Sequence, residues 1–161
     1  MMILTLFSFS TFFISGDGIF PSPEKLIGIT SGAQLSDRTG FIGDIFASAG
    51  RIYTMKVLYY KPNLQNSSLN VYSSYIRIGI GYGHRFKDFA IGTRFFLFLL
   101  TQVITEKNES ITMKTPVRYN SSGMLFFVGH YYYNYLFSLG VEYNRIIQKP
   151  GFYFELRRVL I

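Results

Sequence analysis

The clearest pattern in this chain is a regular alternation of apolar positions with small or polar ones. Between residues 71 and 85, the sequence VYSSYIRIGIGYGHR places isoleucine at alternate positions from Ile76 to Ile80 and sets Arg77 and three glycines between and beyond them. Successive side chains of a strand point to opposite faces, so this spacing predicts a strand with one apolar face. A helix would lose stability at each glycine.

The last third of the chain repeats this alternation. Phe137, Leu139 and Val141 share one face of a predicted strand, and smaller or polar residues occupy the other. Taken along the whole chain, the pattern predicts eight strands, at residues 24–33, 40–49, 51–61, 71–85, 88–103, 117–133, 135–147 and 151–161. Most of them reach the length of about 9–11 residues that a tilted membrane strand needs.

The joins between these strands alternate in length through the first seven strands. Three are short, near Gly50, residues 86–88 and Asn134. The three between them are longer and polar, at residues 34–39, 62–70 and 104–116. A barrel that spans the outer membrane has short periplasmic turns and longer external loops. The sequence therefore predicts an all-β chain that forms a single antiparallel up-and-down transmembrane β-barrel of about eight strands.

The composition favours strands that face lipid. Only 16% of the residues are charged and 19% are aromatic, whereas an average soluble domain carries about 25% charged residues. Two alternatives stay open. A soluble barrel or sandwich also alternates, and residues 123–141 form an uncharged stretch long enough for a membrane helix.

The first fifteen residues, MMILTLFSFSTFFIS, are uncharged and mostly apolar. They resemble the apolar part of a secretory signal and are too short for a comfortable transmembrane helix. We therefore expect a signal peptide at residues 1–15 and a barrel domain at residues 16–161. The alternative is that residues 1–15 form a buried first strand.

The net charge of +7 raises the question of a nucleic-acid partner. The sixteen basic residues are scattered, and no cluster exceeds the pair Arg157–Arg158. Such a distribution favours contact with solvent or lipid headgroups, so we expect outer-membrane lipid and no nucleic acid as a partner. With two histidines, no cysteine and no paired spacing among nine acidic residues, the sequence predicts no catalytic residue, no metal and no cofactor.

Five charged residues fall on the polar faces of the predicted strands. A charge enclosed in a narrow barrel is costly unless it is paired. We therefore expect these residues to form a charge network in the lumen that fills the interior and does not conduct: Arg77, Arg94, Glu142, Glu155 and Arg157.

Long alternating strands with unequal joins resemble the small outer-membrane barrels of the OmpA, OmpX and OmpW type. The resemblance implies a bacterial outer-membrane location and folding by the barrel assembly machinery, which commonly recognises a C-terminal aromatic residue; this chain ends in Leu160-Ile161. Our leading hypothesis is a non-enzymatic outer-membrane barrel. The wall would anchor external loops for surface contacts or envelope integrity, and residues 62–70 and 104–116 are the expected contact surfaces.

Two other functions stay open. The lipid A deacylase family, whose members are enzymes on a barrel wall, uses a His-x-Ser pair, and the corresponding residues here are His130 and Tyr132. The nucleophile is therefore missing, although Ser138 and Glu142 lie on the next predicted strand. The third hypothesis is a narrow channel for small apolar molecules.

Overall fold

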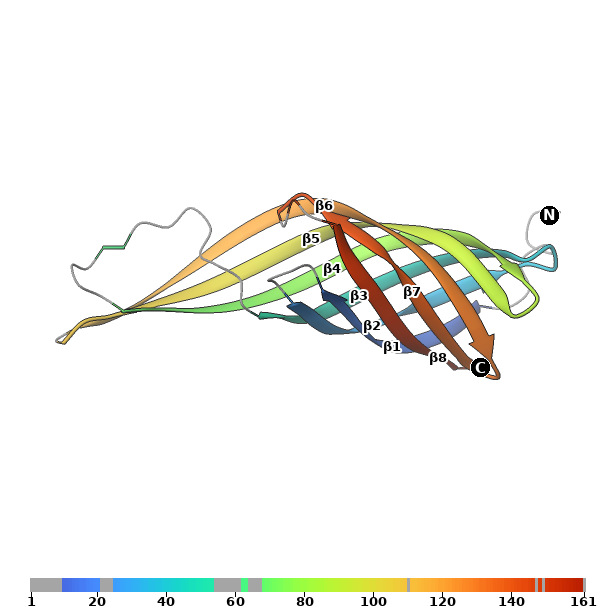
Figure 1. Ribbon diagram of the computed structural model, residues 1–161, viewed down its shortest axis with the longest axis horizontal. Coiled ribbons are helices and arrows are strands. Elements are labelled where there is room, and N and C mark those ends of the chain that lie inside the picture. Colours follow the sequence, from blue (N-terminus) through green and yellow to red (C-terminus); the bar gives the residue numbers. More distant parts are fainter. Residues whose placement is uncertain are drawn as a thin grey trace.

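Eight antiparallel strands close into one barrel in the computed structural model (Figure 1). The structure describes residues 10–20, 25–53, 62–63, 68–109, 111–146, 148 and 150–160. The strands follow each other around the barrel in chain order, and the last pairs with the first. They are β1 Ser10–Phe20, β2 Lys25–Ser36, β3 Phe41–Tyr53, β4 Ser68–Phe86, β5 Phe89–Lys107, β6 Thr112–Tyr132, β7 Tyr135–Asn144 and β8 Pro150–Leu160.

The alternation seen in the sequence separates the two sides of the wall. On β4, Ile76, Ile78 and Ile80 point outward and are 48%, 53% and 61% exposed. Tyr75, just before them, and Arg77, between the first two, point inward and are buried. Exposed apolar side chains and buried charges reverse the arrangement of a soluble protein. The prediction of an antiparallel transmembrane β-barrel is confirmed.

Residues 123–141, which could also be read as a membrane helix, form the end of β6, a tight turn and most of β7. The described part of the chain contains no helix that is long and apolar enough to cross a membrane.

The predicted break at Gly50 was wrong. Gly50 lies inside β3, paired with Gly28 on one side and Tyr75 on the other. A Cβ atom at Gly50 would collide with the carbonyl oxygen of Ile27, so glycine allows a close approach of strands here and makes no turn. The expected strands 40–49 and 51–61 are therefore a single strand as far as Tyr53, and residues 54–61 lie outside the described residues.

The barrel still has eight strands because β1, which is not among the eight predicted strands, takes part in the wall. Ser10–Ile19 pairs with β2, and Phe12–Phe20 pairs with β8, so β1 closes the barrel. The expected signal peptide overlaps this strand at residues 10–15, while residues 1–9 lie outside the described residues. A signal peptide stays a prediction, and residues 10–15, which it was expected to include, pair with neighbouring strands in the wall.

The join between β2 and β3 lies at the other end of the barrel from the one that the sequence predicted. The turns 37–40, 87–88 and 133–134 share one end of the barrel, so the expected long external loop 34–39 is a short turn on the same side as the other two. Asp37 holds this turn by accepting hydrogen bonds from the backbone N–H groups of Thr39 and Phe41. The Thr39 hydroxyl also donates to this carboxylate and lowers the pKa of Asp37. Tight turns mark the periplasmic end of such barrels.

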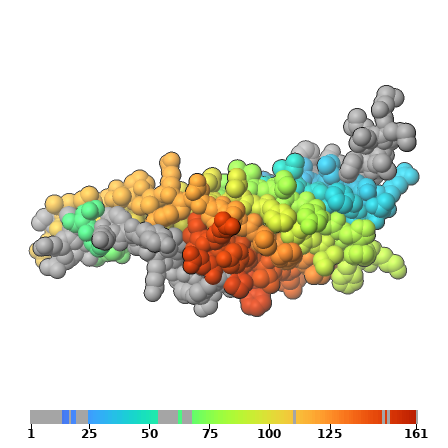
Figure 2. All heavy atoms as spheres, turned by 90° about the horizontal axis from the view of Figure 1, so that it is seen from above, coloured from blue at the N-terminus to red at the C-terminus, as the bar shows by residue number. Residues whose placement is uncertain are grey.

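Three strands continue beyond the opposite, outer end of the barrel. β4, β5 and β6 have 19, 19 and 21 residues, whereas the other strands have 10 to 13. Their outer parts form a narrow three-stranded sheet that projects from the barrel (Figures 1 and 2). We call the part formed by residues 68–72, 103–107 and 112–120 the extension. The expected loops 62–70 and 104–116 are thus strand at residues 68–70, 104–107 and 112–116, with a connection of only four residues, 108–111, between β5 and β6.

The role of β1 can be tested with two shortened chains. A chain that starts at Ser10 keeps all of β1, and we expect it to form a heat-modifiable barrel, whose mobility on a denaturing gel changes on boiling. A chain that starts at Gly16 loses four of the nine residue pairs that join β1 to β8, so we expect no shift. Equal shifts in both chains would contradict the assignment of residues 10–15 to the wall.

Candidate functional site: a lumen charge network and an outer basic surface

A group of four charged side chains crosses the barrel interior. The Nη2 atom of Arg94 on β5 lies 2.9 Å from the Oδ2 atom of Asp44 on β3, and its Nη1 atom lies 3.2 Å from the Oε2 atom of Glu155 on β8. Arg157 contacts the same two carboxylates, at 3.4 Å to Asp44 and 3.1 Å to Glu155. Each carboxylate is therefore shared by two guanidinium groups.

Neutral polar side chains extend this group. Arg157 donates to the Oε1 atom of Gln34 at 2.9 Å, and Ser15 on β1 donates to Glu155 at 2.8 Å. Arg94 also contacts the Tyr153 hydroxyl, at 3.1 Å. These bonds provide several polar partners for ions that are removed from water.

A second ion pair joins the opposite part of the wall. The Nη1 atom of Arg77 on β4 lies 2.7 Å from the Oε2 atom of Glu142 on β7. Arg77 also donates to the Ser48 hydroxyl at 3.0 Å, and its guanidinium lies 5.1 Å from the ring centre of Tyr75. Arginine suits this place because its planar group can form ion pairs and stack on an aromatic ring at the same time.

These ion pairs link strands that are not neighbours in the sheet, with the exception of the pair within β8. They connect β3 with β5, β5 with β8, β3 with β8 and β4 with β7. The six residues are at most 6% exposed, and their three arginines balance their three carboxylates. We call them the lumen network: Asp44, Arg77, Arg94, Glu142, Glu155 and Arg157.

All five charged residues that the sequence indicated lie inside the barrel, and all five take part in these ion pairs. Sequence reasoning missed Asp44, which binds both Arg94 and Arg157. Its strand places Asp44 between Ile42 and Phe46 on the inner face, and the outer face carries Ile45 beside glycine and alanine, so the polar and apolar sides are poorly separated there. A lone carboxylate in the middle of a predicted strand was the available signal.

The residues considered for a deacylase-like site are not brought together. His130 lies on the outer face of β6, where its ring meets the edge of Phe89 at 4.8 Å between ring centres. Ser138 is fully buried on the inner face of β7, and Glu142 is bound to Arg77. The wall separates His130 from Ser138, so these residues do not form a catalytic set. Within the described residues, no group of three His, Asp or Glu side chains is placed to hold a metal ion.

Basic side chains gather on the outward face of the barrel's outer end. The described members are exposed and come from β2, β3, β5, β6 and the β7–β8 turn: Lys25, Arg51, Lys107, Lys114, Arg118 and Arg145. Arg51 stacks over Tyr72 with 4.3 Å between its guanidinium carbon and the ring centre. In the part of the chain whose side chains are described, the one exposed carboxylate at this end is Glu109, in the turn at the tip of the extension.

The inner face of the extension is covered at one point by the β3–β4 connection. Glu106 is fully buried on this inner face, and its carboxylate accepts a hydrogen bond from the backbone N–H of Asn63, with oxygens at 3.0 and 3.2 Å. Lys107, Lys114 and Arg118 project from the opposite face. The extension therefore turns its basic face outward.

Comparison with known proteins finds similarity in fold and none in sequence family. No family model matches the chain, and no curated protein matches its sequence. The crystal structure of Ail, the attachment invasion locus protein of Yersinia pestis, is similar with a TM-score of 0.57 and 9% identity, covering 93% of this chain and 96% of Ail. A second structure of Ail, bound to the heparin analogue sucrose octasulfate, gives the same values. Neisserial surface protein A matches with a TM-score of 0.40 and 12% identity, over 92% of this chain and 94% of its own.

The chain is a bacterial outer-membrane barrel. It has a closed eight-stranded wall, apolar side chains on the outside and charges buried within. An eight-stranded barrel encloses only enough room for side chains. The lumen network lies in that space, which gives no support to the hypothesis of a channel for apolar molecules.

The energetic role of the lumen network can be tested at Glu155. We expect Glu155→Ala to lower the free energy of unfolding by about 3–5 kcal/mol, because it leaves two buried arginines with fewer partners. Arg158→Ala, on the outer face of the same strand, is the matched control, and we expect a change below about 1 kcal/mol. Urea unfolding in lipid vesicles measures both. Equal effects would contradict a structural role of the network.

Proposed function

We propose that this outer-membrane barrel is a non-enzymatic surface protein that uses the outward face of its extension to bind sulfated polysaccharide. The wall serves as a rigid anchor, and the lumen network holds the wall together from within. The observation that carries the proposal is the presence of three exposed basic side chains, Lys107, Lys114 and Arg118, on a sheet that projects beyond the barrel.

The extension is a suitable platform because its backbone is ordered by pairing. β5 is paired along its whole length with β4 on one side and with β6 on the other. A side chain on such a sheet is held in place at little further cost in entropy, whereas a free loop must be ordered on binding. Rigid presentation of charge favours a repeating, extended ligand.

The arrangement of the charges also fits a linear polyanion. Lys114 and Arg118 are four residues apart on one face of β6, about 13 Å along a strand. Lys107 lies on the same face of β5, opposite Thr112. A row of cations without intervening carboxylates attracts a polymer that carries anionic groups along its length.

The solved complex of Ail with a heparin analogue supports the choice of ligand class. At 9% identity, its likeness to this chain concerns the fold, so the binding residues proposed here rest on this chain's own charges. We further propose that an apolar leader at the start of the chain directs export and that the barrel assembly machinery inserts the chain.

The proposal predicts a charge-dependent affinity for heparin. We expect the double variant Lys107→Gln/Lys114→Gln to bind immobilised heparin about tenfold more weakly, because each exposed charge contact contributes up to about 1 kcal/mol. Binding should also weaken with salt, since exposed charges are screened. Retention on a heparin column and equilibrium binding over a salt series measure these effects.

The matched control removes the same charge from the periplasmic end, in Arg38→Gln/Lys87→Gln. Both of these residues are exposed in tight turns. We expect this variant to keep the affinity of the natural chain. An equal loss in the two variants would show that net charge alone attracts heparin, and failure of the natural chain to bind heparin would overturn the proposal.

A further inference from the structure

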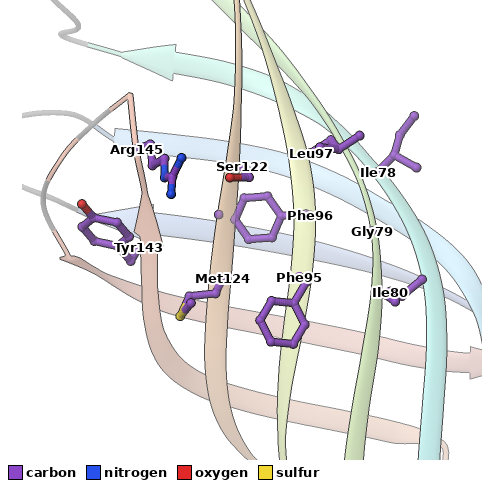
Figure 3. A pocket seen from close by; sticks show the side chains of 11 residues that line it. Ile78, Gly79, Ile80, Phe95, Phe96, Leu97, Ser122, Met124, Tyr143 and Arg145 are labelled. Atoms are coloured by element: carbon purple, nitrogen blue, oxygen red, sulfur yellow. The ribbon is translucent and has the colours of Figure 1, made fainter.

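A groove runs along the outer wall of the barrel over β4, β5 and β6. One hollow within it has a volume of about 500 Å³. Figure 3 shows its outward-pointing lining: Ile78 and Ile80 from β4, Phe95 and Leu97 from β5, and Met124 from β6. These side chains belong to the apolar surface that faces the membrane.

The groove forms where the outward side chains of β6 change from large and apolar to small and polar. Ser122 lies opposite Leu97 in the pairing of β5 with β6, and Asn120 lies opposite Leu99. Leu97 and Leu99 stand out from the wall, whereas the small Ser122 leaves space beside them. A second hollow of about 520 Å³ continues the groove past Leu97, Leu99 and Asn120.

Arg145 lies where the apolar part of the groove meets the polar part. It contributes to the lining of both hollows. Its backbone N–H donates to the carbonyl oxygen of Ser122 at 3.4 Å, which places the start of its side chain beside β6. The side chain is exposed, and the described residues include no carboxylate in an ion pair with it.

The groove lies on the face of the wall that is in contact with the bilayer, so its occupant comes from the bilayer. An acyl chain fits between the apolar side chains, and Arg145 at the outer end attracts an anionic headgroup. We propose that this groove is a binding site for one acyl chain of a lipid in the outer leaflet, whose phosphate is held by Arg145. A zwitterionic lipid offers the same chains but no net negative charge.

This lipid site is separate from the proposed polysaccharide site. Arg145 lies in the β7–β8 turn against the wall, whereas Lys107 and Lys114 lie near the tip of the extension. The substitutions that test the two proposals affect different charged residues, so the two proposals can fail independently.

The absence of tryptophan in the natural chain allows a single reporter to be placed in the groove. Phe95→Trp puts the reporter in the lining, and Leu139→Trp puts it on the lipid-facing side of β7 outside the groove. Each folded full-length variant is placed in phosphatidylcholine vesicles that contain increasing fractions of brominated phosphatidylglycerol or brominated phosphatidylcholine. Bromine quenches tryptophan only on close contact.

In Phe95→Trp, we expect half-maximal quenching at about a fivefold lower fraction of brominated phosphatidylglycerol than of brominated phosphatidylcholine. This difference is the one expected when a single basic residue attracts an anionic lipid. Leu139→Trp should show no such preference. Adding Arg145→Gln to Phe95→Trp should abolish the preference, and Arg145→Lys should keep it. A heat shift on a denaturing gel confirms that each variant is folded.

Equal quenching by the two lipids in Phe95→Trp, or a preference that survives Arg145→Gln, would overturn the proposal. A second measurement needs no reporter: native mass spectrometry of the unsubstituted chain should detect a bound phosphatidylglycerol that Arg145→Gln lacks. Millimolar inorganic phosphate should not displace it. Displacement would show an anion site without specificity for lipid and would also overturn the proposal.

Discussion

Closure of the hydrogen-bond ladder is the constraint on which the rest of this structure depends. In the hydrocarbon of a bilayer, an unpaired backbone N–H or C=O group costs several kcal/mol, so a sheet can cross only if it has no free edge. Here the edge is removed by the pairing of Phe12–Phe20 with Phe152–Leu160. This pairing joins the first and last of the eight described strands, and none of the other seven could replace β1 without changing the order of the wall.

Closure with eight strands determines what the interior can contain. The lumen is as wide as the side chains that fill it, so inward residues must meet one another across the barrel. Three arginines and three carboxylates meet there as a neutral set, and aromatic rings such as Tyr75 and Phe96 lie against the guanidinium of Arg77. The charges lie inside and the apolar side chains lie outside because polar and apolar residues alternate along each strand.

That alternation is why the sequence predicts the fold class and the inward charges on β4, β5, β7 and β8. It fails where the physical reason for alternation is absent. Gly50 resembles a turn because glycine serves both in turns and where strands approach closely. The apolar residues of β1 resemble a signal peptide, since both are short apolar stretches. In the extension, both faces of β6 meet water at several positions, so no apolar face marks residues 112–116 as strand.

The groove and the extension have a common origin in the unequal lengths of neighbouring strands. β7 ends at Asn144, opposite Gly123, whereas β6 continues outward for another eleven residues with only β5 beside it. At that boundary, β6 must change from an apolar outward face to a polar one while β5 keeps Leu97 and Leu99. A polar strand beside an apolar one, with the β7–β8 turn placing Arg145 at their meeting point, creates an amphipathic surface. Where β7 ends and β6 loses this partner, the extension begins to project into water. The same boundary leaves a site for an amphiphile at the wall.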